Sequence, residues 1–293
     1  MTDDESRLIL KAHAKINLGL EVLGKRPDGY HEVAMIMQSV SLHDTVILSL
    51  QEADITLICD RPELPCDNGN LAFRAADLLR REFGVARGVR IELTKRIPLA
   101  AGLAGGSTDA AAVLKGLSRL WRLALSPAEL EQLAARLGSD VPFCLWGGTS
   151  LATGRGEVLT PLPDFDGHGV VLANPPLQVS TAWVYGNYRR PTGDRRRDIH
   201  VLRRSIEQQD FLAVADTLFN DLETVTVPAY PQVADIKAQL LQAGAAGVLM
   251  SGSGPTVFAL TPDSGAAAEL AGRTALGADV AVFIAETVAR EEM

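Results

Sequence analysis

The eight residues from Gly102 to Asp109 contain three glycines and two hydroxyl side chains. They follow Val89–Lys95, an alternating run typical of a strand, and precede Asp109–Trp121, whose alanines and apolar spacing predict a helix. The first N–H groups of a helix lack partners, and the helix dipole places partial positive charge there. Glycines let the backbone approach an anion closely. The stretch therefore predicts a phosphate-binding loop. Ser107 and Thr108 either cap the helix or offer hydroxyls to a phosphate or its magnesium.

The alternative is an ordinary loop before a helix rich in small residues. The stretch lacks the Gly-Lys-Ser/Thr ending of a Walker loop and the Gly-x-Gly pair of a Rossmann turn. The density of glycines and hydroxyls between a strand and a helix nevertheless favours phosphate binding.

Other polar groups stand at turns or within apolar runs. Taken alone, Lys15 is best explained as a strand lysine whose stem covers the core while its charge reaches water. Asp140 suits an N-cap. Tyr30 and His31, which follow a turn, suit the start of a strand. Ser251–Gly254 suits either a tight hairpin turn or a backbone that lies against a phosphate. Spacing alone does not bring these groups together.

Composition restricts the classes of protein to consider. The chain has 293 residues, 47% hydrophobic and 22% charged, with a net charge of −8. This acidic balance argues against a nucleic-acid partner. Three cysteines without a Cys-x-x-Cys spacing argue for a reducing compartment and against a zinc site. The start of the sequence is acidic and unlike a signal peptide, and the apolar runs are too short to span a membrane. We expect a cytoplasmic protein without a membrane partner.

The first half of the chain predicts an N-terminal mixed or antiparallel sheet with helices. Capping and stop signals predict helices over Asn70–Phe83, ending at Gly84, and over Pro127–Leu137, begun by Ser126. Strands are predicted over Leu8–Leu23, Glu32–Leu42, Asp44–Leu50, Asp54–Cys59 and a pair within Thr149–Val158.

The second half predicts an α+β domain with an antiparallel sheet. We place the boundary in a proline-containing stretch, which divides the chain into domains 1–163 and 164–293. Arg189–Asp198 contains five arginines and is predicted to be an exposed loop. Strands are predicted over Val170–Asn174, Gly247–Met250, Thr256–Leu260 and Asp279–Glu286, and helices over Thr181–Tyr188, Ile199–Gln209, Phe211–Phe219, Pro231–Ala243 and Asp263–Ala275.

Three motifs in order resemble the GHMP kinases, a family named after galactokinase, homoserine, mevalonate and phosphomevalonate kinases. They are Ala14–Leu20, Pro98–Ala111 and Ser251–Thr256. The likeness extends over essentially the whole chain. It implies a two-domain fold in which an ATP site and a substrate site face each other across a cleft.

Further motifs narrow the likeness to one branch of that family. They are Arg26–His31, Gly138–Phe143 and Asn220–Glu223. This branch phosphorylates a cytidyl diphosphate sugar alcohol at its 2-hydroxyl, in the non-mevalonate route to isoprenoid precursors. The resemblance therefore implies ATP and Mg²⁺ as cofactors and a small-molecule substrate. It leaves a monomer and a homodimer equally open.

The resemblance also assigns roles to individual residues. Asp140 accepts the proton of the attacking hydroxyl, and Lys15 pairs with Asp140 beside the transferred phosphoryl group. Ser107 is the expected magnesium ligand. The expected ATP contacts are Pro98, Gly102, Leu103, Ala104, Gly105, Gly106, Ser107, Thr108, Gly252 and Gly254, and the expected substrate contacts are Asn17, Tyr30, His31, Thr181 and Tyr185.

The sequence departs from the family pattern at one position, and two alternative functions compete with the kinase of this branch. Ala104 stands where the family often has glycine, and its methyl group matters only if the residue needs a positive φ. The first rival is a homoserine- or mevalonate-type kinase, which would not need Tyr30 and His31. The second is an inactive nucleotide-binding regulator, against which the presence of both Lys15 and Asp140 argues.

Overall fold

The computed structural model describes residues 6–190 and 198–291. The chain forms two compact units. Unit 1 contains residues 1–14, 43–97 and 104–146, and unit 2 contains residues 15–42, 98–103 and 147–293. Each compact unit is therefore assembled from three separate stretches of the chain, and no single boundary divides the chain into the two units. The division into family domains 1–163 and 164–293 stays a prediction. Part of the predicted Arg189–Asp198 loop, residues 191–197, lies outside the described residues.

Two long strands, β1 (Arg7–Lys25) and β2 (His31–Gln51), supply residues to both units. In unit 1 they belong to a sheet of order β3-β4-β2-β1, in which β4 (Gly88–Thr94) lies between β2 and β3 (Ile55–Cys59). The β2–β4 pair is antiparallel and the β3–β4 pair is parallel. The sheet is therefore mixed, as predicted. The two strands predicted over Glu32–Leu42 and Asp44–Leu50 form the single strand β2.

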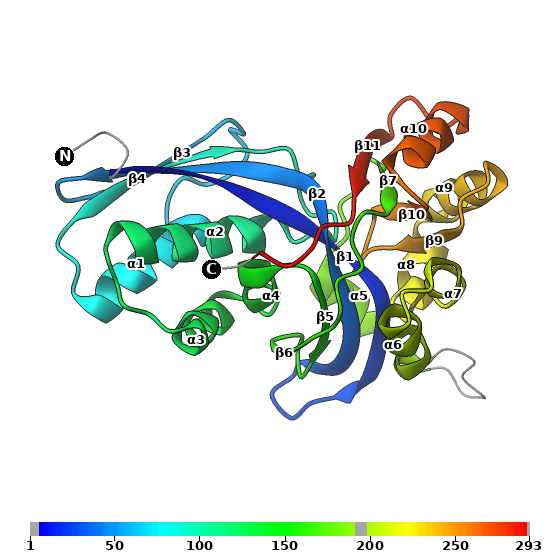
Figure 1. Cartoon of the computed structure of the whole chain (residues 1–293), viewed down its shortest axis with the longest axis horizontal. Helices are drawn as coiled ribbons and strands as arrows, with labels where there is room; N and C mark the ends of the chain where they lie inside the picture. Colours follow the sequence, from blue (N-terminus) through cyan, green and yellow to red (C-terminus); the bar gives the residue numbers. More distant parts are fainter. Residues whose placement is uncertain (1–5, 191–197, 292–293) are drawn as a thin grey trace. The chain divides into compact units, whose positions relative to one another are not determined.

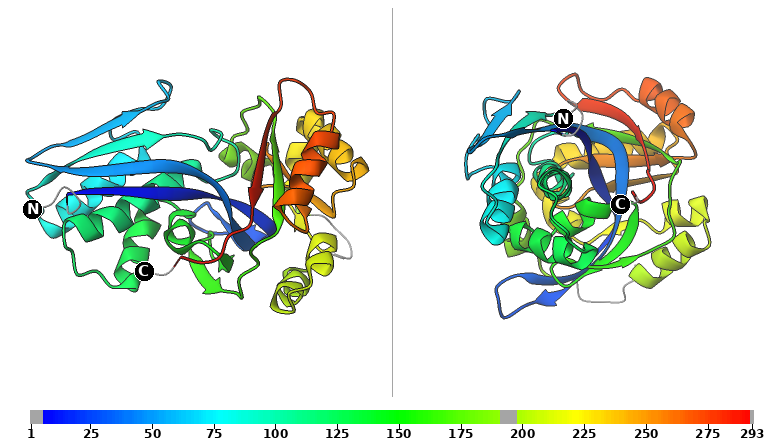
Figure 2. Two further views of the ribbon diagram at one scale, coloured as in Figure 1. Left: turned by 45° about the horizontal axis from the view of Figure 1, so that its top comes forward. Right: turned by 60° about the vertical axis from the view of Figure 1, so that its left-hand side comes forward.

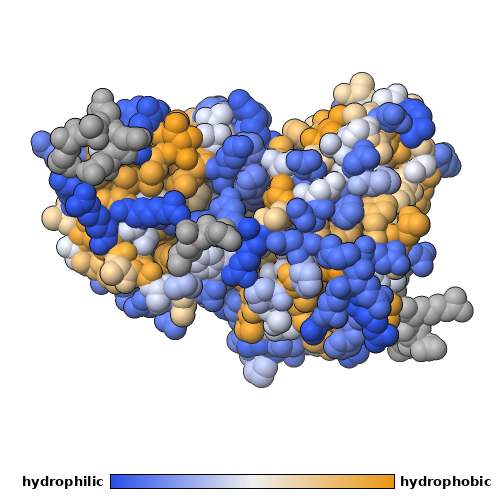
Figure 3. All heavy atoms as spheres, in the orientation of Figure 1, coloured by the Kyte–Doolittle hydropathy of each residue, from blue (hydrophilic) through white to orange (hydrophobic). Residues whose placement is uncertain are grey.

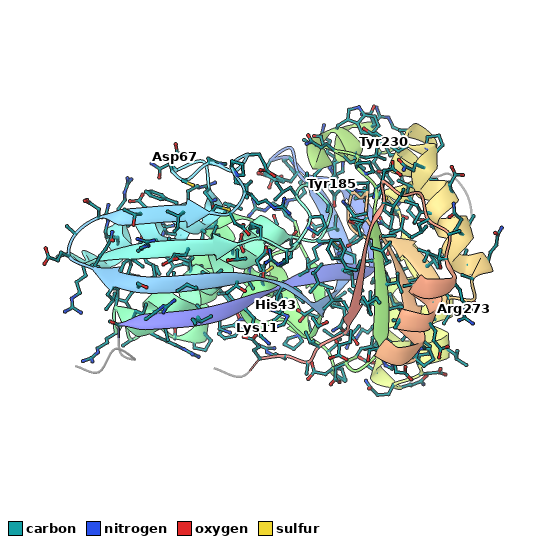
Figure 4. The ribbon with its side chains drawn as sticks, turned by 90° about the horizontal axis from the view of Figure 1, so that it is seen from above. Lys11, His43, Asp67, Tyr185, Tyr230 and Arg273 are labelled. Carbon is teal, nitrogen blue, oxygen red and sulfur yellow. The ribbon has the colours of Figure 1, made fainter. Side chains whose placement is uncertain are left out.

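Helices cover one face of the unit 1 strands (Figures 1 and 2). Alternate strand residues such as Val46, Leu48 and Ile91 are buried against alanines and leucines of the helices. Gly116 lets a helix approach closely, because a Cβ there would lie 2.3 Å from Leu48 Cδ1. The opposite face, which carries Lys11 and His43, is turned toward the viewer in Figure 4. The helices are α1 (Leu71–Phe83), α2 (Gly105–Leu120), α3 (Pro127–Leu137) and α4 (Val141–Trp146).

Unit 2 contains a four-stranded antiparallel sheet of order β11-β7-β10-β9. Its central strand β7 is a continuous apolar run because both faces are covered. The hairpin of β5 and β6 pairs with β2. The strands are β5 (Thr149–Thr153), β6 (Val158–Pro161), β7 (Gly169–Asn174), β9 (Gly247–Met250), β10 (Val257–Thr261) and β11 (Ala281–Glu286).

The helices of unit 2 follow the sequence prediction with two additions. The predicted ones are α5 (Thr181–Asn187), α6 (Ile199–Glu207), α7 (Phe211–Asp216), α9 (Pro231–Gln242) and α10 (Ser264–Arg273). The unpredicted elements are the two-residue strand β8 (Phe219–Asn220), which pairs in parallel with β1, and α8 (Glu223–Ala229). Two residues are too few for a periodic signal, and Pro228 within α8 argues against a helix at the sequence level.

Hydrophilic and hydrophobic side chains are mixed on the face drawn in Figure 3. Large exposed apolar side chains such as Leu212 and Ile9 are scattered along the sequence. Among the described helices, none combines the length and apolarity required to cross a membrane.

Candidate active site

The predicted phosphate loop leads directly into α2, whose first residue is Gly105. The helix begins four residues earlier than predicted, so Ser107 and Thr108 lie in its first turn and do not cap it. The Thr108 hydroxyl is buried and donates to the His13 carbonyl oxygen at 2.7 Å, which ties the helix to β1. Ser107 is half-buried. Of the two hydroxyls, that of Ser107 is therefore the better placed to meet a ligand.

Ala104 is the N-cap of α2 and adopts φ +59°, in the left-handed region. This conformation suits glycine and strains an alanine. Its side chain makes no capping hydrogen bond. The departure from the family pattern therefore occurs at a position that does need a positive φ, and Ala100 in the same loop has φ +50°.

In unit 2, the turn Ser251–Gly254 joins β9 to β10 and packs on Gly102. The Ser251 hydroxyl donates to the Gly102 carbonyl oxygen at 3.0 Å. Gly102 has φ +75°, and a Cβ there would lie 2.2 Å from the Ser251 carbonyl oxygen. Close approach and backbone conformation both require glycine here. The second and third motifs of the sequence are thus brought together.

Lys15 lies on β1 and is only 4% exposed. Its Nζ donates to Asn17 Oδ1 at 2.6 Å, and its backbone N–H donates to the Leu103 carbonyl oxygen at 3.2 Å. The expectation that its charge reaches water was wrong, because both faces of β1 are buried here. Asn17 is fully buried, and its Oδ1 would lie 3.5 Å from a Cβ on Gly252. The first motif therefore lies beside the other two.

Asp140 belongs to unit 1 and is half-buried just before α4. Its carbonyl oxygen accepts the Cys144 N–H at 3.1 Å, which begins α4. Lys15 belongs to unit 2, so the pairing of these two side chains stays a prediction.

Aromatic residues predicted to bind substrate gather in unit 2. The rings of His31 and Tyr185 have centroids 5.2 Å apart, and Figure 4 labels Tyr185 on α5. Burial, followed by the nearby Lys25 charge, lowers the pKa of His31. The ring is therefore neutral at pH 7 and can both donate and accept a hydrogen bond. Tyr30 is 54% exposed and lies under the Arg155 guanidinium, 4.9 Å from its ring centroid.

Two hydroxyl contacts involve the two ends of α5, the helix that carries Tyr185. Thr181, the first residue of α5, and Ser253 have their hydroxyl oxygens 2.9 Å apart. This contact links α5, which carries Tyr185, to the turn Ser251–Gly254. The Tyr188 ring is buried, and its hydroxyl donates to Asp221 Oδ2 at 3.0 Å.

Sequence reasoning missed Arg155, which follows Gly154 in the β5–β6 turn. Its Nε donates to Glu157 Oε1 at 3.2 Å, and its backbone N–H donates to Glu157 Oε2 at 2.6 Å. The Gly154 carbonyl oxygen accepts the Val33 N–H, which fixes the turn beside the start of β2. A lone arginine between two glycines gives no pattern from which this contact could have been predicted.

Sequence reasoning also missed a buried ionic cluster in unit 1. Lys95 Nζ contacts Asp44 Oδ2, and it contacts Asp109 Oδ2 at 2.5 Å. Asp44 Oδ1 accepts the N–H groups of Arg96 and Ile97. Asp109 was part of the phosphate-loop motif but had no assigned role. The cluster joins α2 to the end of β4, and only tertiary structure brings its three residues together.

Charge balance explains the protonation of this cluster. Two buried carboxylates face one ammonium, so full ionisation leaves one uncompensated negative charge. Burial raises the pKa of Asp109 to about 7 despite the Lys95 charge, and Asp44 adds to the rise. The two carboxylates raise the pKa of Lys95 against its own burial. Asp109 Oδ1 is buried without a hydrogen-bond partner among the described residues, which adds to the cost of ionising it.

Family models match both halves of the chain. The model of the GHMP kinases N terminal domain matches residues 70–148, and that of the GHMP kinases C terminal matches residues 202–273. The chain belongs to the GHMP kinase family. The matched ranges include helix α2, and Asp140 lies near the end of the first. The two-domain α+β fold expected from the motifs is thereby confirmed.

Several curated relatives of this kinase share one name, 4-diphosphocytidyl-2-C-methyl-D-erythritol kinase. One from Synechococcus sp. (strain JA-2-3B'a(2-13)) is 53% identical over 270 residues, covering 89% of this chain and 87% of the relative. One from Acetivibrio thermocellus is 50% identical, covering 86% of this chain and 89% of the relative. The chain groups with these kinases within the family, as its sequence motifs predicted.

Solved structures agree with this grouping. A crystal structure of 4-(cytidine 5'-diphospho)-2C-methyl-D-erythritol kinase is 34% identical, with a TM-score of 0.79, covering 96% of this chain and 99% of that chain. Homoserine kinase from Cytophaga hutchinsonii has the same TM-score at 22% identity, covering 100% of this chain and 96% of that one. The second likeness shows the fold alone.

Proposed function

We propose that this GHMP kinase transfers the γ-phosphoryl group of ATP to the 2-hydroxyl of 4-diphosphocytidyl-2-C-methyl-D-erythritol. The choice of acceptor rests on one observation. The sequence is 50% or more identical, over most of the chain, to curated kinases named after this acceptor. The family supplies ATP as the phosphate donor. The products are ADP and the 2-phosphate of the acceptor.

The ATP phosphates would bind at Gly102–Thr108 and at the turn Ser251–Gly254. The packing of Ser251 on Gly102 supports a joint role for the two loops. The start of α2 adds unpaired N–H groups and a favourable dipole. We assign the adjoining loop residues Pro98, Leu103 and Ala104 to the same site.

Mg²⁺ would be held chiefly by the phosphates, with Ser107 as its protein ligand. Among the described residues, no group of three or more acidic, histidine or cysteine side chains is arranged to hold a metal. Asp109 is engaged by Lys95 and turned to the core. A site built from one hydroxyl and substrate phosphates fits the way Mg²⁺ binds in many kinases. Bound Mg²⁺ neutralises charge on the phosphate oxygens.

Lys15 and Asp140 would act on the reacting groups. The Asp140 carboxylate orients the acceptor hydroxyl and takes its proton as the bond to phosphorus forms. A carboxylate is a weak base toward an alcohol, so orientation and late proton acceptance matter more than prior deprotonation. The Lys15 ammonium pairs with Asp140 and stabilises negative charge that develops on the phosphoryl oxygens. Asn17, which accepts a hydrogen bond from Lys15, would fix the direction of that ammonium.

The cytidyl end of the acceptor would bind among Tyr30, His31 and Tyr185. The partly exposed Tyr185 beside His31 supports its choice over Tyr188, whose hydroxyl is already used in the core. A neutral His31 suits recognition of a base edge that presents both a donor and an acceptor. Thr181 would contact the sugar alcohol from the start of α5.

A comparison of acceptors tests the proposal. Purified protein is given Mg·ATP with the cytidyl acceptor, homoserine or mevalonate, and ADP release is followed in a coupled assay. We expect kcat/KM for the cytidyl acceptor to exceed that for either small alcohol by at least about 10³-fold, since a site built for polar groups rejects ligands that leave them unpaired. Equal or greater activity on homoserine or mevalonate would overturn the proposal.

Two variants distinguish this function from the two alternatives, a homoserine- or mevalonate-type kinase and an inactive nucleotide-binding regulator. Tyr30→Ala should raise KM for the cytidyl acceptor about tenfold, which corresponds to the loss of roughly one stacking contact. Tyr230→Ala is the control.

Asp140→Asn should abolish turnover but retain nucleotide binding, measured by calorimetry. Turnover in Asp140→Asn at the wild-type rate would exclude Asp140 as the base.

Size-exclusion chromatography with light scattering would decide between a monomer and a homodimer.

A further inference from the structure

The turn Ser251–Gly254 is held by a segment to which no role has yet been assigned. This segment, residues 220–226, begins at the last residue of the short strand β8 and includes the first half of α8. Asn220 is fully buried, and its Nδ2 donates to the carbonyl oxygens of Met250 at 2.8 Å and Gly252 at 2.7 Å. Its Oδ1 accepts the Leu222 N–H at 2.9 Å, which fixes the orientation of the amide.

Thr226 holds the next part of the turn. It is fully buried, and its hydroxyl donates to the Ser253 carbonyl oxygen at 3.1 Å. The Ser251 carbonyl oxygen accepts the Gly254 N–H at 2.9 Å. Four consecutive carbonyl oxygens, from Met250 to Ser253, therefore accept hydrogen bonds from within the protein.

This arrangement bears on anion binding. A carbonyl oxygen carries partial negative charge and repels a phosphate, whereas backbone N–H groups attract it. The donors that hold the carbonyl oxygens from Met250 to Ser253 fix the backbone so that these oxygens face the protein. They also remove the conformational freedom that four residues, two of them glycines, would lose on binding. An amide suits position 220 because it supplies two neutral N–H donors, while a carboxylate supplies none.

We infer that Asn220 and Thr226 are positioning residues that make Ser251–Gly254 an anion-binding turn for the phosphates of the nucleotide. They act through the backbone of the turn and do not touch the ligand. The inference rests on the proposed function, which places nucleotide phosphates at this turn. It gives a role to the Asn220–Glu223 motif, where Glu223 also accepts the Met250 N–H at 3.0 Å.

The test compares two threonines of one segment. Thr226→Val removes the hydroxyl bound to Ser253 at almost unchanged volume. Thr224→Val is the matched control, because the Thr224 hydroxyl donates to the Asp221 carbonyl oxygen and not to the turn. Affinity for ADP is measured by calorimetry, together with KM for ATP, kcat and the midpoint of thermal unfolding.

We expect Thr226→Val to weaken ADP binding and raise KM for ATP about fivefold to tenfold, the value of one neutral hydrogen bond. Thr224→Val should change both by less than twofold, and Thr226→Ser should restore ADP affinity. Asn220→Asp should weaken ADP binding more than Thr226→Val does. Because Asn220→Asp can also impair folding, the Thr226 series decides the outcome.

Equal ADP affinity in Thr226→Val and Thr224→Val would overturn the inference, as would equal weakening in both. The kcat of Thr226→Val at saturating ATP separates positioning from damage to the chemical step, and it should stay within twofold of the wild type. If wild-type protein binds ADP but phosphorylates none of the three acceptors, the proposed function fails while the test of the turn remains valid.

Discussion

Two buried lysines, one in each unit, illustrate opposite uses of a buried charge. Lys95 of unit 1 is 2% exposed and contacts two aspartates. Lys15 of unit 2 is 4% exposed and donates to the neutral amide of Asn17. Two carboxylates compensate the Lys95 charge within the fold, whereas the contact of Lys15 with a neutral amide orients its ammonium without adding negative charge. Burial alone therefore does not distinguish the structural Lys95 from Lys15, for which we propose a catalytic role, and the effects of substitution must do so.

The largest effect is expected on turnover, from Lys15→Met. Loss of the ammonium that we propose acts on the transferred phosphoryl group should lower kcat by about 10²–10³-fold, as removal of one preorganised electrostatic donor does in other enzymes. The assay is ADP release with the cytidyl acceptor at saturating ATP. Turnover above a tenth of the wild-type rate would break the comparison, because Lys15 would then be no more catalytic than Lys95.

The next effect concerns stability. Lys95→Met leaves two buried carboxylates without a cation and should lower the free energy of unfolding by about 3–5 kcal/mol. Urea denaturation followed by circular dichroism measures it, with Lys15→Met as the comparison. If Lys15→Met destabilises the protein as much as Lys95→Met, the distinction between a structural and a catalytic lysine is wrong.

The pH dependence of stability sharpens the account of the Lys95 cluster. The pKa of Asp109 is raised from 3.8 to about 7 in the folded protein. Between these values the folded state binds the extra proton, so this group contributes stability below about pH 4 that is lost as pH rises toward 7. Asp109→Asn imitates the protonated acid. We therefore expect its stability relative to the wild type to increase between pH 5 and pH 8 in urea melts. A difference independent of pH would mean that Asp109 is ionised throughout.

The smallest effect tests backbone strain at the start of α2, the helix that Asp109 anchors. Ala104→Gly relieves a left-handed alanine, worth about 1–2 kcal/mol, but adds freedom to the unfolded chain, worth about 0.5–1 kcal/mol. We expect a net gain of about 0.5–1 kcal/mol in the free energy of unfolding. A net loss would indicate that the alanine methyl group contributes packing that outweighs the strain.

The sequence by itself determined most of the elements and the order of the three motifs. Local signals were sufficient there: the helix begun by Ser126 and the helix that ends at Gly84 both occur as predicted, the first with a capping box and the second with Gly84 in the left-handed conformation. Alternation marks a strand with one buried face, such as β4, and a continuous apolar run marks a strand with two covered faces, such as β7. The three motifs alone indicated the GHMP kinase family, and the family models and relatives confirm it.

Tertiary structure decided which polar residues have partners. Nothing local in the sequence links Asp44 to Lys95 or Asn220 to Gly252, since residues distant along the chain meet only after strands pair and helices pack. For the same reason the sequence favoured a solvent-reaching Lys15, whereas packing on both faces of β1 buries it. Hydrophobic patterning specifies a fold through many weak and redundant contacts. A site depends on a few polar contacts, each set by the whole fold, so its partners became known only from the structure.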